Sequence, residues 1–316
     1  MNKKLAILDL GTNTFHLLIA EVTEDAHYTL YREKISVKIG QNGISHGYIT
    51  PEAEARAIDA IVHFRGIIQS QGVSEVYAIA TSAFRNAANG QQLAQKIYDA
   101  TGIQVTIISG DREAELIYYG VKKALQIGPE ISLILDIGGG SNEFIICDDH
   151  HIYWKESFEI GAQRLYDIFH GHDPILKEDM ARLEIYLENK LKALSAAVEI
   201  YKPTVLIGAS GAFDTLNEIY RQENGIEILF YETEFEMPAQ KFFDIHSEIV
   251  TKNREERMKI PGMIEMRVDM IVVASCLINH IIRKHGFNRI RTSAYSLKEG
   301  VLHDILNTVR GKVTAA

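Results

Sequence analysis

The chain has 316 residues, of which 46% are hydrophobic and 24% are charged, so its composition is that of a globular protein. This composition excludes wholesale disorder, a collagen-like chain and a small disulfide-framework protein. The formal net charge of −9 argues against a general nucleic-acid binder, because such proteins are more often basic. The two cysteines, Cys147 and Cys276, stand far apart in apolar runs and are expected to be buried free thiols.

No segment of the sequence is typical of a secretion signal or a membrane span. The apolar run at residues 5–8 is too short for the hydrophobic region of a signal peptide, although two lysines precede it. The longest apolar stretch, residues 270–282, contains Asn279 and His280 and is too short to cross a bilayer. We therefore expect a cytoplasmic protein that binds neither membranes nor nucleic acid.

The sequence contains an internal repeat. Residues 7–20 read ILDLGTNTFHLLIA and residues 134–147 read ILDIGGGSNEFIIC, and the two segments align without a gap. Each is an apolar run, an Asp-x-Gly turn and a second apolar run, which predicts a β-hairpin with an aspartate at its mouth. The shared turn favours duplication over chance similarity.

Strands and helices are expected to alternate around both hairpins. The predicted strands cover residues 75–81, 104–108 and 204–207, and the predicted helices cover residues 52–71 (capped by Thr50), 90–101, 111–127 and 173–201, with another beginning at 213. Such alternation is typical of an α/β fold, in which helices cover the sheets. We place a domain boundary near residue 126, so that residues 1–126 and 127–316 form two closely packed domains with a cleft between them.

The glycine-rich turn of the second hairpin indicates a phosphate site. Gly138, Gly139 and Gly140 are consecutive and are followed by Ser141, which is more glycine than an ordinary turn needs. Glycine lets backbone N–H groups approach an anion closely, so phosphate binding is the favoured interpretation. A merely flexible turn is the alternative.

The aspartates at the hairpin mouths cannot bind phosphate themselves, because like charges repel. Asp9 and Asp136 are therefore predicted to bind Mg²⁺, directly or through water, and the metal ion would also coordinate phosphate oxygens. Glu143, on the strand that returns from the second turn, is either a further metal ligand or a solvated strand glutamate.

Five motifs occur in the order found in a known family. They are DLGTNTFHLLIAEV at 9–22, TSAFRNAANG at 81–90, SGDREAELIYYGV at 109–121, DIGGGSNEF at 136–144 and IGASGAFDTL at 207–216. With these motifs the chain resembles, over nearly its whole length, the exopolyphosphatase and guanosine-pentaphosphate phosphatase family of the sugar kinase, actin and heat-shock-ATPase superfamily. The resemblance implies two ribonuclease-H-like domains, an active site in the cleft between them, and a final helix at residues 303–313 that packs back on the first domain.

A glutamate near the start of a predicted helix is the candidate general base. Ser109 is a suitable N-cap for this helix, and Glu113 shares its helical face with Ile117 and Gly120, whereas Glu115 points to nearly the opposite side. A glutamate that serves only the helix dipole is the alternative. In the family that the chain resembles, the glutamate immediately before the alanine of this motif is catalytic, which implies that role for Glu113.

The resemblance also implies phosphate contacts elsewhere in the chain. Arg85 would bind phosphoryl oxygens through its planar guanidinium, and a surface arginine is the alternative. Further contacts are expected from two loops, at Gly11, Thr12, Asn13, Gly208, Ser210 and Gly211.

Two features near the C-terminus stay open. Residues 293–302 resemble the family's closing motif but depart from it at Ala294, Ser296 and Lys298, so we assign them no role. The segment 252–298 contains ten basic and four acidic residues, a net charge of +6. It is either a track for a polyanion or a basic surface without a partner.

The sequence favours a Mg²⁺-dependent hydrolase that releases the terminal phosphate of inorganic polyphosphate. Guanosine pentaphosphate, cleaved by the same apparatus, is the alternative substrate. Two other classes remain as alternatives: a sugar or acetate kinase of the same superfamily, and a module that senses polyphosphate or nucleotide without cutting it. The oligomeric state is open, with a homodimer among the options.

Overall fold

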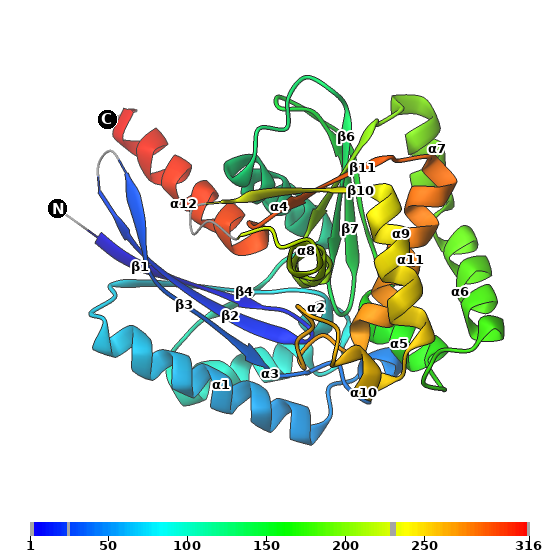
Figure 1. Ribbon diagram of the computed structural model, residues 1–316. Coiled ribbons are helices and arrows are strands. Elements are labelled where there is room, and N and C mark those ends of the chain that lie inside the picture. The colour runs from blue at the N-terminus through cyan, green and yellow to red at the C-terminus, as the bar shows by residue number, and fades with distance from the viewer. Residues whose placement is uncertain (1–2, 24–25, 228–231, 315–316) are drawn as a thin grey trace.

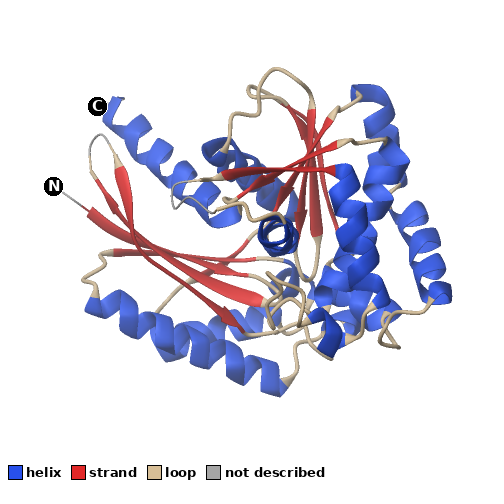
Figure 2. Cartoon of the chain, in the orientation of Figure 1, coloured by secondary structure: helices blue, strands red, loops and turns tan. Residues whose placement is uncertain are grey.

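The protein is built on two mixed β-sheets, each formed by one half of the chain. The computed structural model describes residues 3–23, 26–227 and 232–314. The first sheet has the strand order β3-β2-β1-β4-β5, and the second has the order β10-β11-β9-β6-β7-β8 (Figures 1 and 2). The strands are β1 (Lys3–Leu10), β2 (Thr14–Val22), β3 (His27–Ser36), β4 (Glu75–Ala80), β5 (Val105–Ile107), β6 (Ser132–Ile137), β7 (Asn142–Cys147), β8 (Ile152–Phe158), β9 (Val205–Ala209), β10 (Glu234–Pro238) and β11 (Arg289–Ser293).

The two hairpins predicted from the internal repeat are β1–β2 and β6–β7. β1 pairs antiparallel with β2 and parallel with β4, and β6 pairs antiparallel with β7 and parallel with β9. From its β8 edge, the second sheet runs β8-β7-β6-β9-β11, which repeats the order of the first sheet, and β10 is added beyond β11. The matching connectivity supports duplication of one structural unit.

Helices cover the outer faces of the sheets. α1 (Pro51–Ser70) begins where the Thr50 side chain accepts a hydrogen bond from the N–H of Ala53, as predicted, and it buries Ala57 and Phe64 against the first sheet. The other helices, apart from two described below, are η1 (Ile44–His46), α2 (Ser82–Asn86), α3 (Gly90–Thr101), α5 (Ala162–Phe169), α6 (Lys177–Lys190), α7 (Lys192–Tyr201), α8 (Gly211–Glu223), α9 (Ala239–Thr251), α10 (Arg254–Arg257) and α11 (Met270–His285).

The single helix predicted over residues 173–201 is wrong, because the structure has two helices there. Leu191 separates α6 from α7, and its φ of −98° and ψ of 24° lie outside the α-helical region. The prediction also began too early in the sequence. Asp173 precedes Pro174, and a residue before proline disfavours the helical conformation.

Two helices, α4 (Gly110–Ala124) and α12 (Leu297–Thr314), lie between the inner faces of the sheets (Figure 1). Strand alternation sends Ile7 of β1 and Ile134 of β6 inward, where both belong to the same buried cluster as Ile117 of α4. α12 also contacts β1 of the first sheet. α12 begins at Leu297, whereas the sequence predicts that this helix starts at residue 303.

Both cysteines are buried and free, as predicted. Among residues 3–23, 26–227 and 232–314, no helix is long and apolar enough to cross a membrane. The domain boundary near residue 126, just after α4, stays a prediction.

The two inner helices approach each other through a pair of glycines. A Cβ atom on Gly120 would lie 2.0 Å from the carbonyl oxygen of Ser296, and a Cβ atom on Gly300 would lie 1.8 Å from the carbonyl oxygen of Leu116. No side chain fits at either point, because both obstacles are backbone atoms. The crossing therefore requires glycine on both helices and sets how close α12 comes to α4.

We predict that Gly300→Ala lowers the free energy of unfolding by about 1–3 kcal/mol, the usual cost of overpacking. Gly66→Ala is the matched control, since Gly66 also lies inside a helix but a Cβ atom there would meet nothing within 4 Å. It should raise stability by up to about 1 kcal/mol, because alanine restricts the unfolded chain. Urea denaturation measures both, and equal effects would contradict the close-crossing argument.

Candidate active site

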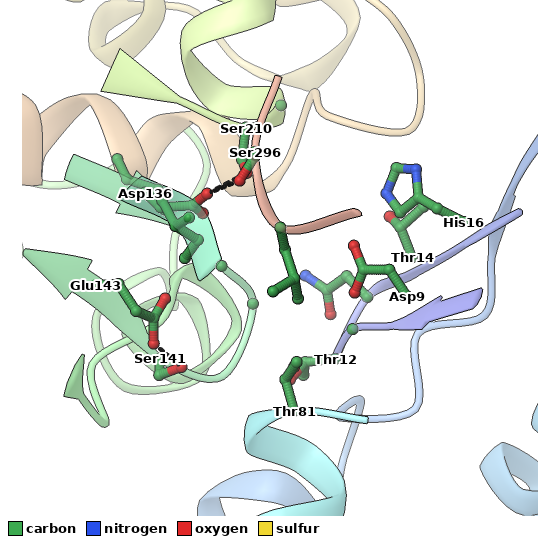
Figure 3. Close-up of a pocket in the computed structure, with 18 of the residues that line it drawn as sticks. Asp9, Thr12, Thr14, His16, Thr81, Asp136, Ser141, Glu143, Ser210 and Ser296 are labelled. Carbon is green, nitrogen blue, oxygen red and sulfur yellow. Dashed lines mark hydrogen bonds between the residues drawn. The ribbon is translucent and has the colours of Figure 1, made fainter. Parts of the chain in front are cut away.

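A cavity of about 140 Å³ lies between the two hairpin turns and the first turns of α4 and α12 (Figure 3). All but two of the predicted site residues line it: Asp9, Gly11, Thr12, Asn13, Glu113, Asp136, Gly138, Gly139, Gly140, Ser141, Glu143, Ser210 and Gly211. The exceptions are Arg85 and Gly208. The fold thus brings together residues as far apart in the sequence as Asp9 and Gly211, which are separated by about two thirds of the chain.

Strand register places the carboxylates on opposite sides of this cavity. Asp9 stands opposite His16 in the β1–β2 pair, and Asp136 stands opposite Glu143 in the β6–β7 pair. Directly opposed residues project to the same face of a sheet, so each hairpin presents a polar pair at its mouth. Glu143 is only 1% exposed, so its interpretation as a solvated strand residue is wrong.

The glycines of the second turn make room for the first turn. A Cβ atom on Gly139 would lie 2.8 Å from Cγ of Asn13, and one on Gly140 would lie 2.6 Å from Oγ1 of Thr12 and 2.5 Å from Oγ of Ser82. The close approach of an anion is the reason for these glycines that the sequence predicts. The structure adds a second reason, which is the close approach of side chains from the other half of the chain.

Both turns contain backbone N–H groups that are free to bind an anion, although the N–H groups of two of the predicted glycines are not free. The N–H of Gly11 donates to the carbonyl of Thr14, and the N–H of Gly138 donates to the carbonyl of Ser141, so both serve to close their own turns. Within the described ranges, four amides that follow them donate to no protein group: Thr12, Asn13, Gly139 and Gly140. Oγ1 of Thr12 and Oδ1 of Asn13 are also buried without a hydrogen-bond partner in this part of the chain. Such groups can be satisfied by a bound anion with its counter-ion.

Asp136 is held by two serines, one of which the sequence analysis left without a role. Its Oδ2 accepts hydrogen bonds from Oγ of Ser210, at 2.7 Å, and from Oγ of Ser296 (Figure 3). Burial raises the pKa of Asp136 and the two hydroxyl donors oppose that rise. Ser296 immediately precedes α12, and its N–H donates to Glu299, so the S-x-x-E pattern of a helix start was the available sequence signal.

Cationic side chains also reach the cavity, from positions to which the sequence assigns no individual role. Lys34 of β3, Arg267 and Lys298 line it, together with Asp214 of α8. Burial lowers the pKa of Lys298, but Glu299 and Asp9 more than offset this, so its pKa is raised overall. Lys298 therefore stays charged and partly balances the buried carboxylates.

Glu113 is bound to Arg85 at the start of α4. Ser109 caps the helix by accepting a hydrogen bond from the N–H of Arg112, and Nη1 of Arg85 donates to Oε2 of Glu113 at 2.9 Å. Burial raises the pKa of Glu113 to about 7, with a further rise from nearby carboxylates and a reduction from Arg85. Nη2 of Arg85 donates to Oε1 of Glu159 at 3.2 Å. Arg85 is thus paired with two carboxylates rather than lining the cavity.

Gly208 does not lie in the cavity, which corrects its prediction as a phosphate-binding residue. It belongs to β9, and a Cβ atom there would lie 2.0 Å from the ring of Phe213. The glycine therefore accommodates a core aromatic ring. Its neighbours along the loop, Ser210 and Gly211, do line the cavity.

The basic segment 252–298 is not a continuous cationic surface. Arg257 is 0% exposed, and its Nη1 donates to Oδ1 of Asp173 at 2.6 Å. Arg254 forms ion pairs with Glu265 and Asp269. The positive charges of Arg254 and Arg257, at the start of this segment, are therefore neutralised within the protein. This part of the segment is not the polyanion track that the sequence left as one possibility.

The donor set fits Mg²⁺ only if a ligand completes the coordination. In the described part of the chain, no group of three His, Cys, Asp or Glu side chains is close enough to hold a metal ion. Asp9 and Asp136 nevertheless supply hard oxygen donors on the two sides of the cavity. Mg²⁺ is commonly held by one or two carboxylates together with waters and substrate phosphates, so these residues fit that mode.

We predict that Glu159→Gln strengthens binding of inorganic phosphate by about threefold or more, because it frees a donor edge of Arg85 from a competing carboxylate. Isothermal titration calorimetry measures this. Asp167→Asn is the control, since Asp167 accepts a hydrogen bond from Ser45 at 3.0 Å, also between the two halves of the chain. If Glu159→Gln binds phosphate more weakly and Asp167→Asn does not, Glu159 orients Arg85 and does not compete with phosphate for it.

Known proteins match this chain over nearly its full length. A family model described as the Ppx/GppA phosphatase family matches residues 18–309. A Haemophilus influenzae protein named "Putative exopolyphosphatase" is 25% identical over 308 residues, which cover 96% of this chain and 91% of that protein. The crystal structure of an exopolyphosphatase from Cytophaga hutchinsonii is 44% identical, with a TM-score of 0.94 and coverage of 97% of this chain and 98% of that one.

More distant structures share the same architecture. The Aquifex aeolicus member of the Ppx/GppA family superimposes with a TM-score of 0.78 at 21% identity, covering 98% of this chain and 99% of that one. The two-domain actin-like fold expected from the sequence is thereby confirmed. Together with the match of the family model over most of the sequence, these comparisons show that the chain belongs to the Ppx/GppA phosphatase family and is a hydrolase.

Proposed function

We propose that this protein is an exopolyphosphatase that depends on Mg²⁺ and releases the terminal phosphate of inorganic polyphosphate by hydrolysis. The observation that carries the proposal is the position of Glu113, a buried carboxylate that lines the same cavity as two turns with free amides. This arrangement supports in-line attack of water on a bound phosphoryl group. Phosphoryl transfer needs mainly positioning and electrostatic stabilisation, which these groups supply.

In this mechanism the terminal phosphoryl group binds the free amides of the Thr12–Asn13 and Gly139–Gly140 turns. Glu113 accepts a proton from the attacking water as the new P–O bond forms and the bond to the bridging oxygen breaks. Arg85 does not line the cavity, but its Nη2 lies 3.5 Å from Oγ of Ser141, which does, so a phosphoryl oxygen that displaces Glu159 would accept a hydrogen bond from it. When bound, Mg²⁺ would be held by Asp9 and Asp136 and would neutralise charge on the phosphate oxygens.

The lining of the cavity favours polyphosphate over a nucleotide substrate. No Phe, Tyr or Trp is among the described residues that line it, so a purine base would find no aromatic surface there. The same argument disfavours a kinase, which needs an adenosine pocket. Guanosine pentaphosphate stays the second candidate substrate, because its terminal phosphate could occupy the same turns.

The test of function is phosphate release from long polyphosphate and from guanosine pentaphosphate, measured side by side with and without Mg²⁺. We expect faster release from polyphosphate and little release without the metal. A higher kcat/KM for guanosine pentaphosphate would reverse the substrate assignment. Retention of either substrate without cleavage would favour a sensing module.

We predict that Glu113→Gln slows turnover about 10²–10⁴-fold, the usual effect of losing a general base, while the fold and phosphate binding persist. Glu115→Gln is the control, because Glu115 pairs with Arg112 outside the cavity and should change turnover little. Steady-state kinetics and calorimetric phosphate titration provide the measurements. A near-normal rate for Glu113→Gln would remove this residue from the mechanism.

The pH dependence of activity should report the pKa of Glu113. Because the base must be deprotonated, kcat/KM should fall as the pH drops through about 7, the value to which burial raises its pKa. Arg85→Gln removes a cation that opposes this rise, so it should move the acid limb to higher pH. An acid limb at the ordinary carboxylate value in the wild type would contradict the assignment.

We predict that Asp136→Asn increases the Mg²⁺ concentration needed for half-maximal activity, because a hard cation loses a charged oxygen ligand. A Mg²⁺ titration of phosphate release measures this shift. Asp111→Asn serves as the control, since Asp111 pairs with Lys155 on the surface. An unchanged titration with a reduced maximal rate would mean that Asp136 acts on something other than the metal.

A further inference from the structure

The three glycines of the second turn are held from behind by the start of α5. Three consecutive N–H groups there donate to the three glycine carbonyls: Gly161 to Gly140 at 3.1 Å, Ala162 to Gly138 at 2.9 Å and Gln163 to Gly139 at 2.9 Å. In a trans peptide the C=O and the N–H that follows it point in opposite directions. Because the carbonyls of Gly138 and Gly139 point toward α5, the N–H groups of Gly139 and Gly140 point away from it, and both glycines line the cavity.

The first turn has a matching support in the loop after β3. The N–H of Gly40 donates to the carbonyl of Thr12 at 3.2 Å, and a Cβ atom on Gly40 would lie 2.4 Å from Cγ2 of Thr12. The same peptide geometry directs the N–H of Asn13 away from this loop. The N–H of Ile44 donates in turn to the carbonyl of Gly40 at 3.0 Å, so η1 is hydrogen-bonded to the segment that holds the first turn.

Arg164 of α5 joins the two supports. Its Nε donates to the carbonyl of Gly140 and its Nη1 donates to the carbonyl of Ile44, each at 2.9 Å. The side chain is 15% exposed and is not among the described residues that line the cavity. A guanidinium is planar and holds its donors in a fixed arrangement. One rigid group therefore links the turn of one half of the chain to the loop that holds the turn of the other half.

We propose that Arg164 is a positioning residue that sets the separation of the two phosphate-binding turns without touching the substrate. The inference rests on the proposed function, in which one phosphoryl group binds free amides of both turns. A group that binds two turns at once is sensitive to the distance between them. The apolar cluster between the sheets holds the two halves together independently of Arg164, so loss of this side chain loosens the turns without unfolding the protein.

Two substitutions separate the geometry of the guanidinium from its charge. Arg164→Met removes every donor and keeps a long side chain, whereas Arg164→Lys keeps the positive charge and removes the planar fork. Arg291→Met is the matched control. Arg291 is 11% exposed and donates to the backbone carbonyls of Gln126, at 2.6 Å, and Ile127, at 3.2 Å, but it is not among the described residues that line the cavity.

Three measurements are made on each variant. Isothermal titration calorimetry gives the affinity for inorganic phosphate, and steady-state kinetics give kcat/KM for tripolyphosphate and for long polyphosphate. Pulsed electron paramagnetic resonance gives the distance between spin labels on Val62→Cys in α1 and Ile185→Cys in α6, one in each half of the chain. Both label positions are exposed and both native cysteines are buried, so the labels attach at the introduced thiols.

We expect both Arg164 variants to bind inorganic phosphate at least about fivefold more weakly and to lose kcat/KM about tenfold or more, equally for short and long chains. The distance distribution between the labels should broaden in both. Arg291→Met should show none of these changes. Phosphate affinity of the wild-type value in Arg164→Lys would overturn the proposal, because charge alone would then suffice.

Two other results would also overturn the proposal. Equal losses in Arg291→Met would mean that the effect is a general loss of stability, which urea denaturation of each variant reports separately. Weaker phosphate binding with an unchanged distance distribution would mean that Arg164 does not act through the separation of the turns.

The outcomes distinguish this inference from the proposed function. If the wild type hydrolyses no polyphosphate, the proposed function fails, while the phosphate titration and the distance measurement still decide the role of Arg164. Unchanged phosphate affinity and unchanged distances in both Arg164 variants would overturn the inference and leave hydrolysis in place.

Discussion

The arrangement of the whole site depends on the contact between α4 and α12, where two glycines allow two backbones to touch. Gly120 and Gly300 lack side chains at the crossing, so α12 approaches α4 more closely than any side chain would permit. α4 carries Glu113, and the start of α12 carries Ser296 and Lys298. The packing of two helices therefore determines the distance between the candidate base and the groups that hold the carboxylates.

The second constraint is electrostatic. The cavity contains several buried carboxylates, and the cationic side chains beside them neutralise only part of their negative charge. Burial raises the pKa of Asp9 to about 7, although Lys298 opposes this, and it raises the pKa of Asp214 to about 6. Glu143 has its pKa raised well above the usual value, by burial and then by nearby carboxylates. Such a site favours the entry of protons or of a cation, which is the electrostatic basis for expecting a metal to accompany an anionic substrate.

Polar contacts at the rim join the two halves of the chain around the cavity. Oγ of Ser82 donates to Glu159 at 2.7 Å, and Nη1 of Arg164 donates to the carbonyl of Ile44 at 2.9 Å. These contacts are partly buried, whereas the α4–α12 contact lies in the apolar cluster between the sheets. Burial of apolar surface is generally the larger source of stability in such a contact, and partly buried polar contacts contribute less.

The local structure and the chemistry available at the two hairpins follow from the amino-acid sequence alone. The repeated Asp-x-Gly segments predicted β1–β2 and β6–β7, because apolar runs around a tight turn form hairpins whatever they later pack against. Helical periodicity placed Glu113 on an inward face, and it is buried there. The motifs of the resembled family covered nearly the whole chain, and the family model confirmed the membership.

Which distant residues come into contact depends instead on how the helices and sheets pack in the folded protein. Ser296 and Lys298 enter the cavity because the α4–α12 crossing brings the start of α12 beside Asp136 and Asp9, and no local pattern encodes that approach. Glycine and arginine are common in phosphate-binding sites. Gly208, however, accommodates the ring of Phe213, and Arg257 pairs with Asp173 in the interior. Periodicity shows which face of an element is buried, but the partner on that face depends on packing between segments that are far apart in the sequence.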